Sequence, residues 1–253
     1  MLHFDDIVFG PIKSRRLGNS LGINILPSKG KLCNFDCIYC ECGWNRDGIV
    51  RGSRFPVFEE VRDAIDVAFA RIAADGLSVD SITMSGNGEP TLNPDFPEIV
   101  DYILQMRDCY FPSAKVSVLS NATMLGNEAV LNALMKIDNP ILKIDASSDS
   151  LIREMNRPSG TYSLERVVEY MMRFDGNFIL QTMFLKSPDF STVSTEALSA
   201  WYDIVRRIRP REIMVYTIDR ETPDKRLLKY SVSEMEDFVK PLTEEGYVIQ
   251  IRG

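Results

Sequence analysis

Histidine, long apolar runs and disulfide-forming cysteines are scarce in this sequence of 253 residues. Its one histidine is His3, so the sequence offers almost no residues for histidine-based acid–base or metal chemistry. No run of about 18 apolar residues occurs, so we expect no membrane-spanning helix, and the first residues lack the features of an export signal. Five cysteines, three of them in one short loop, do not form a secreted disulfide framework. The composition therefore predicts a cytoplasmic globular protein that does not bind membranes.

Positive charge is also in deficit, but it is unevenly distributed. The formal net charge is −7, which is not typical of a nucleic-acid binder, although a local basic patch would suffice. Residues 1–54 contain 8 Lys and Arg against 5 Asp and Glu, so the N-terminal part is the basic part. Its arginines either meet an anionic substrate or form a solvated surface; they are Arg15, Arg16, Arg46, Arg51 and Arg54.

A loop of three cysteines is the most informative motif. Cys33, Cys37 and Cys40 lie in the run Cys-Asn-Phe-Asp-Cys-Ile-Tyr-Cys. Three thiolates can hold three irons of a 4Fe-4S cluster and leave the fourth iron free for a ligand that is not protein. A zinc site or an electron-transfer cluster could instead use Cys42 as fourth ligand. Both are disfavoured, because zinc ribbons pair two separated knuckles and the bacterial ferredoxin spacing ends in Cys-Pro.

A second motif, Gly-Asn-Gly-Glu-Pro, follows the apolar run 81–84. Together and in this order, the two motifs resemble those of the radical S-adenosylmethionine (SAM) superfamily. The resemblance implies that the three loop cysteines bind a 4Fe-4S cluster and that the second motif contacts the ammonium of SAM. Glycines permit close backbone approach, and a carboxylate pairs with a cation. The residues of this segment are Gly86, Asn87, which replaces the first common glycine, Gly88, Glu89 and Pro90.

Further residues are assigned to SAM by the same resemblance. It implies that Tyr39, the aromatic residue before the last loop cysteine, lies near the adenine. It also implies that Ser120, Asn121 and Gln181 contact the ribose or the methionine carboxylate. Turn capping is the alternative role for serine and asparagine at such positions.

A narrower resemblance is carried by residues 9–23, Phe-Gly-Pro-Ile-Lys-Ser-Arg-Arg-Leu-Gly-Asn-Ser-Leu-Gly-Ile, and by residues 85–92. These stretches are similar to a branch of small radical SAM proteins grouped with the wyosine tRNA synthases. The resemblance implies an electron donor of flavodoxin or ferredoxin type and an anionic substrate such as tRNA. The better-studied wyosine synthases carry further cysteines for an auxiliary cluster, and here only Cys42 and Cys109 are left over. We expect Cys109 to be a buried small hydrophobe.

Strand and helix patterns alternate along the whole chain without a linker, which predicts βα units and a parallel sheet. The expected helices lie near 61–72, 94–103, 127–136, 163–174, 195–209 and from 231 onward. The expected strands are 21–26, 81–85, 115–120, 141–146, 178–185, 212–218 and 247–251. About six βα units follow a short N-terminal extension. Right-handed crossovers and the family resemblance favour one α/β domain over residues 1–253, an open partial (βα)6 barrel, over a doubly wound sheet.

Ligands in such folds lie beyond the carboxyl ends of the strands. Both motifs fall at that edge, since each directly follows an expected strand. Other polar residues at the ends of expected strands become candidates for the cofactor site; they include Asp145, Ser147, Ser148, Thr182, Tyr216 and Asp219.

Three functional classes remain open at this level. The first is a radical SAM enzyme that acts on tRNA or another phosphate-bearing substrate. The second is an activase that abstracts hydrogen from a glycine of a partner enzyme, although the Asp-Gly-Pro-Gly and Asn-Pro stretches usual in activases are missing around this cysteine loop. The third is a non-enzymatic iron-sulfur electron carrier.

Overall fold

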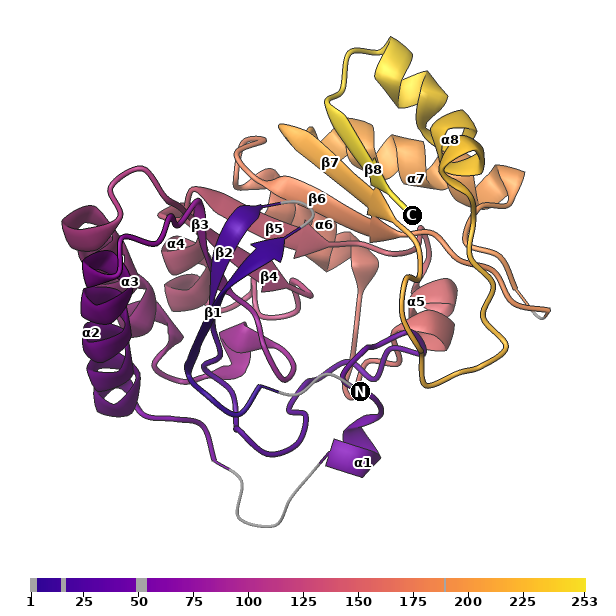
Figure 1. The fold of residues 1–253 in the computed structure, drawn as a ribbon. Coiled ribbons are helices and arrows are strands. Elements are labelled where there is room, and N and C mark those ends of the chain that lie inside the picture. The colour runs from indigo at the N-terminus through magenta and orange to yellow at the C-terminus, as the bar shows by residue number, and fades with distance from the viewer. Residues whose placement is uncertain (1–3, 15–16, 49–53, 189) are drawn as a thin grey trace.

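One curved sheet of eight strands forms the centre of the molecule (Figure 1). The computed structural model describes residues 4–14, 17–48, 54–188 and 190–253. The strands are ordered β1 to β8 as in the sequence; β1 and β2 are antiparallel, and all later neighbours are parallel. Their bounds are β1 Val8–Ser14, β2 Gly18–Ile23, β3 Ser81–Met84, β4 Lys115–Ser120, β5 Asn139–Lys143, β6 Ile179–Met183, β7 Glu212–Tyr216 and β8 Ile249–Arg252. This is the expected open, partial α/β barrel.

The helices that connect the parallel strands lie on the outer face of the curved sheet (Figure 1). Each long helix connects two parallel strands, as a βα crossover requires. The helices are α1 Asn45–Gly48, α2 Phe58–Ala74, α3 Phe96–Tyr110, α4 Glu128–Met135, α5 Asp149–Met155, α6 Leu164–Met172, α7 Thr195–Ile208 and α8 Val232–Glu244, with a 3-10 turn η1 at Pro90–Leu92. The main apolar core fills the space between helices and sheet. A separate apolar cluster of Ile141, Ile179 and Met214 covers part of the inner face.

The N-terminal extension contains a strand that the sequence pattern did not reveal. Strand β1 pairs with β2, and the pairing shifts between Phe9 and Ile12, where Gly10 and Pro11 interrupt the alternation. Such a break is typical of edge strands. Gly22 leaves room for the Phe9 ring, because a Cβ there would lie 2.1 Å from the tip of that ring. The Phe9 ring stacks on Phe4 at 4.0 Å between centroids.

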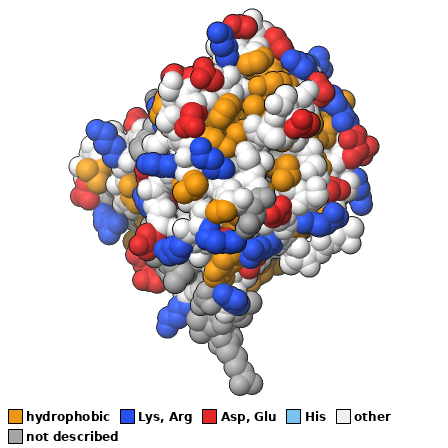
Figure 2. Space-filling model, turned by 90° about the vertical axis from the view of Figure 1, so that its right-hand side faces the viewer, with side chains coloured by type: hydrophobic (Ala, Val, Ile, Leu, Met, Phe, Trp, Pro, Cys, Tyr) orange, Lys and Arg blue, Asp and Glu red, His pale blue; other side chains and the backbone are white. Residues whose placement is uncertain are grey.

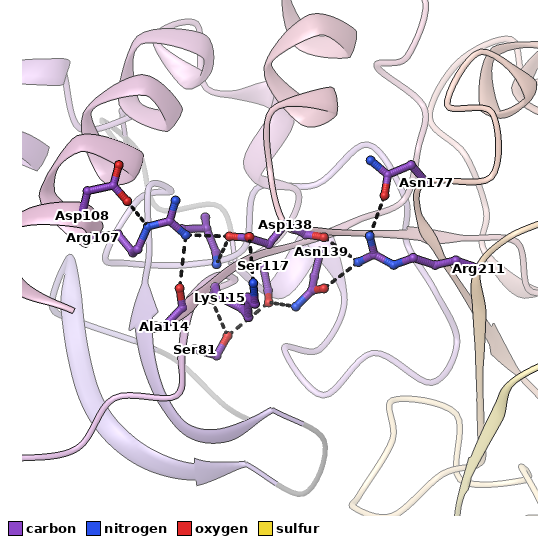
Figure 3. Close-up of polar contacts among 11 residues, drawn as sticks. Ser81, Arg107, Asp108, Ala114, Lys115, Ser117, Asp138, Asn139, Asn177 and Arg211 are labelled. Atoms are coloured by element: carbon purple, nitrogen blue, oxygen red, sulfur yellow. Dashed lines mark hydrogen bonds and ion pairs between the residues drawn. The ribbon is translucent and has the colours of Figure 1, made fainter. Parts of the chain in front are cut away.

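Polar contacts tie the amino ends of the strands together (Figure 3). Arg107 donates to the Asp138 carboxylate at 2.7 Å, and this carboxylate also accepts the Val116 N–H at 2.9 Å. Asn139 accepts from Arg211 at 2.6 Å. The contacts join β4, β5 and the start of β7, so this end of the sheet is held by groups that bond to one another.

Candidate functional site

The two sequence motifs meet at the carboxyl ends of β2 and β3. The cysteine loop follows β2, and residues 86–90 follow β3. A short parallel bridge joins them: the Leu32 N–H donates to the Asn87 carbonyl at 2.8 Å, and the Glu89 N–H donates to the Leu32 carbonyl at 3.1 Å. Gly88 has φ +139°, and a Cβ there would lie 1.9 Å from the Leu32 oxygen. Only glycine fits this contact.

The three loop cysteines line one cavity of about 280 Å³. All three are free thiols. Segment 86–90 contributes Gly86, Gly88 and Glu89 to the wall; Tyr39, Ser120, Asn121 and Gln181 also belong to it. Within the part of the chain that the structure describes, no three or more His, Cys, Asp or Glu side chains converge as they would around a single metal ion. Three sulfurs spread over a cavity wall suit a cluster, in which each thiolate binds a different iron.

Each loop sulfur has its own polar neighbour. Asn156 donates to the sulfur of Cys37 at 3.3 Å, and Asn121 lies 3.8 Å from the sulfur of Cys33. A hydrogen bond from Cys42 lowers the pKa of Cys40 to about 6. Burial raises the pKa of Cys33 and of Cys37, that of Cys37 to about 11. Hydrogen bonds from the Phe35 N–H to Cys33 and from Asn156 to Cys37 act in the opposite direction and partly offset burial. Such donors favour the thiolate, which is the form that binds metal.

The carboxylate of Glu89 is buried at the rim of this cavity and has a dense set of donors. It accepts from the Ser120 hydroxyl at 2.9 Å, the Asn121 N–H at 2.7 Å, and the Thr91 hydroxyl at 2.5 Å. Burial raises the pKa of Glu89, and the hydrogen bonds counteract that rise. Ser120 and Asn121 therefore hold the carboxylate in one orientation.

A second buried network also borders this cavity. The Lys143 ammonium donates to the hydroxyls of Tyr39 at 2.9 Å and of Tyr216 at 3.0 Å. Tyr39 in turn donates to Asp145, whose carboxylate also accepts from Asn156 at 2.7 Å. Burial lowers the pKa of Lys143, but Asp145, Tyr216 and Cys37 together outweigh burial and raise it above the ordinary value. The wall of the cavity thus contains the Glu89 carboxylate and Lys143, whose ammonium lies 3.8 Å from the Asp145 carboxylate.

Sequence reasoning missed Lys143 and Asn156. The expected strand 141–146 extends three residues beyond the observed end of β5 at Lys143. The carboxyl end of this strand is therefore three residues earlier, and Lys143 stands at the edge where ligands bind. Asn156 follows α5, a helix of 7 residues, which is too short for a clear periodic signal.

Several predicted residues do not line this cavity. The Asn87 amide donates to the carbonyls of Phe4 at 2.9 Å and Pro27 at 3.0 Å, so it anchors the N-terminal segment. Pro90 begins the turn η1. Asp145 acts through its partners and is not itself in the wall, and Ser147 is not in the wall either. Cofactor contacts by these residues stay predictions.

The other strand-end candidates have different surroundings. Ser148 caps α5, and the Thr182 hydroxyl donates to the Ile144 carbonyl at 2.7 Å. Tyr216 and Asp219 line the cavity. Capping and sheet contacts therefore explain Ser148 and Thr182, whereas Tyr216 and Asp219 belong to the cavity wall.

The basic residues of the N-terminal part have mixed surroundings. Arg46 lies over the Trp44 ring at 5.9 Å, and Arg54 pairs with Glu60 at 2.6 Å. Arg15, Arg16 and Arg51 lie outside the described residues. The expectation that Cys109 is buried was wrong: the residue is exposed near the end of α3, because it falls on the helix face away from the core.

Comparison with known families decides the class of protein. The sequence model of the Radical SAM superfamily matches residues 28–186, which contain both motifs. The chain belongs to the radical SAM superfamily. The cofactors of this superfamily are a 4Fe-4S cluster and SAM.

Individual relatives and solved structures have low sequence identity to this chain. A UPF0026 protein of Methanocaldococcus jannaschii is 28% identical over 223 residues, which are 87% of this chain and 65% of the relative. The chain thus spans less than two thirds of that relative. The crystal structure of a radical SAM methyltransferase from Sphaerobacter thermophilus matches with a TM-score of 0.69 at 15% identity, and the match covers 92% of this chain and 65% of the methyltransferase chain. The crystal structure of archaeal TYW1 matches with a TM-score of 0.53 at 13% identity, and the match covers 89% of this chain and 71% of the TYW1 chain. The structures are similar in fold.

A search of the described helices for membrane spans found none with the length and hydropathy needed to cross a bilayer.

Proposed function

We propose that Cys33, Cys37 and Cys40 hold the 4Fe-4S cluster and that SAM binds beside it in the same cavity. One observation carries this proposal: the three thiols and the Glu89 carboxylate, which come from different motifs, line a single cavity. The donor set suits the cluster, since it offers three sulfurs with polar neighbours. Strands from both ends of the chain share one sheet, which supports the further proposal that residues 1–253 form one domain.

When bound, a reduced cluster supplies the electron that splits SAM into methionine and a 5′-deoxyadenosyl radical. The residues of this chain bind and orient the reactants. Glu89, held by Ser120 and Asn121, accepts from the ammonium of SAM. Lys143, paired with Asp145, holds the hydroxyls of Tyr39 and Tyr216. Tyr39, fixed by Lys143 and Asp145 in the wall of the cavity, can flank the adenine.

The direct test is reductive SAM cleavage by the anaerobically reconstituted protein. We expect about four irons per chain and 5′-deoxyadenosine after addition of SAM and dithionite. Cys37→Ala should lose the cluster and the product, and the exposed Cys109→Ala serves as the matched control that keeps both. A loaded cluster that never yields 5′-deoxyadenosine would leave the chain as an electron carrier.

A second cavity of about 290 Å³ supports a proposal about the substrate. It lies along the inner face of the sheet and shares Glu41, Leu119 and Arg220 with the first cavity. Stacked Phe4 and Phe9 and the cation Lys13 also line it. We infer that it receives part of an anionic substrate with a planar apolar group, such as a nucleotide of tRNA.

Charges of both signs lie on the face shown in Figure 2, where Lys and Arg side chains cross the middle with Asp and Glu side chains among them. Arg220, which lines both cavities, pairs with Glu41 at 2.6 Å across 179 residues of sequence. An anionic group could compete for this arginine. The electron donor we propose is a flavodoxin or ferredoxin.

A further inference from the structure

Lys31 is a buried lysine beside the cysteine loop that the proposed function does not use. Its side chain is 1% exposed. An ammonium removed from water is costly unless partners compensate for its lost hydration. Its burial therefore calls for an explanation in terms of the charges around it.

The partners of Lys31 all belong to the cysteine loop and its immediate continuation. Its ammonium donates to the Gly43 carbonyl at 3.0 Å and lies 3.5 Å from the Asp36 carboxylate. Asp36 is 29% exposed and accepts the Asn45 N–H at 2.7 Å. The negative charge of Asp36 is thus partly screened by water and shared with another donor, whereas the positive charge of Lys31 is not exposed to water.

Lys31 also lines the cavity that contains the three loop sulfurs. The hydrogen bond to Gly43 and the ion pair with Asp36 suit an ammonium. The side chain therefore places a buried positive charge in the wall that it shares with the three sulfurs.

We propose that Lys31 raises the reduction potential of the cluster by stabilising its reduced form. The inference rests on the proposed cluster site. A 4Fe-4S core of charge +2 with three thiolates has a net charge of −1, and one electron from the donor makes it −2. A fixed positive charge in a region of low dielectric stabilises the more negative state more strongly. The residue acts through the cluster and would let a less strongly reducing donor suffice.

The test is a redox titration of the reconstituted full-length protein without SAM, followed by electron paramagnetic resonance. In Lys31→Met, the ratio of reduced to oxidised cluster at a fixed potential should fall at least about tenfold, which corresponds to a midpoint about 59 mV lower for one electron. Lys29→Met is the matched control, because Lys29 is exposed and solvent screens its charge. Its midpoint should equal that of the unmodified protein.

A second variant keeps the proposal testable if Lys31→Met fails to bind the cluster. Asp36→Asn keeps the ammonium and the oxygen that accepts from Asn45 but removes the neighbouring negative charge, so its midpoint should rise. If Lys31→Met loads four irons with an unchanged midpoint, Lys31 only holds the loop and the proposal is overturned. If it takes up no iron, an unchanged midpoint in Asp36→Asn overturns the proposal. Failure of the unmodified protein to take up a cluster would instead refute the proposed function.

Discussion

The two ends of the sheet both carry charged residues, but they use them differently. At the amino end, Asp138 binds Arg107, Lys115 and a backbone N–H, and its side chain is 25% exposed. At the carboxyl end, Glu89 is 2% exposed and is held by neutral donors only. An anion paired with cations is already neutralised. An anion held by hydroxyls and amides keeps its charge for a ligand, so the difference separates a structural network from a binding site.

The largest effect expected from this comparison is on SAM binding. Glu89→Gln keeps the shape of the side chain but removes its charge, so it should weaken SAM binding to the reconstituted protein about tenfold or more, because a hydrogen bond to a charged group contributes about 1.5–3 kcal/mol. Equilibrium binding of radiolabelled SAM measures it. Asp138→Asn is the matched control at the other end of the sheet and should bind SAM normally. Equal affinities in all three proteins would reduce segment 86–90 to a turn.

Asp138→Asn should instead lower stability, by about 1–3 kcal/mol of unfolding free energy, since it removes the charge that pairs with Arg107 and Lys115 and leaves Arg107 with Asp108 as its remaining carboxylate partner. Urea denaturation of Asp138→Asn and of the unmodified protein measures this difference in unfolding free energy. We expect Asp138→Asn to shift the midpoint downward with an unchanged slope. An unaltered midpoint would show that the amino-end network does not stabilise the fold.

The pH dependence of stability provides a further check on the same carboxylate. Burial raises the pKa of Asp138, but the Val116 N–H and the Arg107 guanidinium outweigh it and hold the pKa below its ordinary value. The carboxylate therefore contributes stability above the unfolded pKa, about 4, and loses it as the pH falls through the lower folded pKa. The stability difference between the original protein and Asp138→Asn should thus shrink as the solution is acidified, and a constant difference would contradict this origin.

The smallest and least direct effect concerns the second cavity. If its substrate is a single-stranded region of RNA, log affinity should fall with log salt concentration by about 0.7 per phosphate contacted. Lys13→Ala should make this slope shallower by about one contact and leave cluster content unchanged. Filter binding of tRNA between low and high salt tests it, with the exposed Lys115→Ala at the amino end as the control. Binding that ignores salt would favour a neutral or peptide substrate.

Much of this architecture could be predicted from local patterns. The helices α2, α3, α4, α6, α7 and α8 and the strands from β2 onward follow apolar runs and capping signals, such as Ser231 with Glu234 at the start of α8. Strand β1 could not be predicted, because Gly10 and Pro11 interrupt its pattern. It also pairs antiparallel with β2 and so stands outside the repeating βα units. Helix α5 was missed because it is short.

The sequence alone determined the chemistry of the site, because the spacing of Cys33, Cys37 and Cys40 limits what the loop can bind, and the glycines and Glu89 of the second motif specify a close backbone approach beside an anion. Only the tertiary structure decided which charged and polar side chains surround that loop. Lys31, Lys143 and Asn156 have no motif of their own. Their effect depends on burial and on distance to the sulfurs, and both are set when separate segments of the chain pack together.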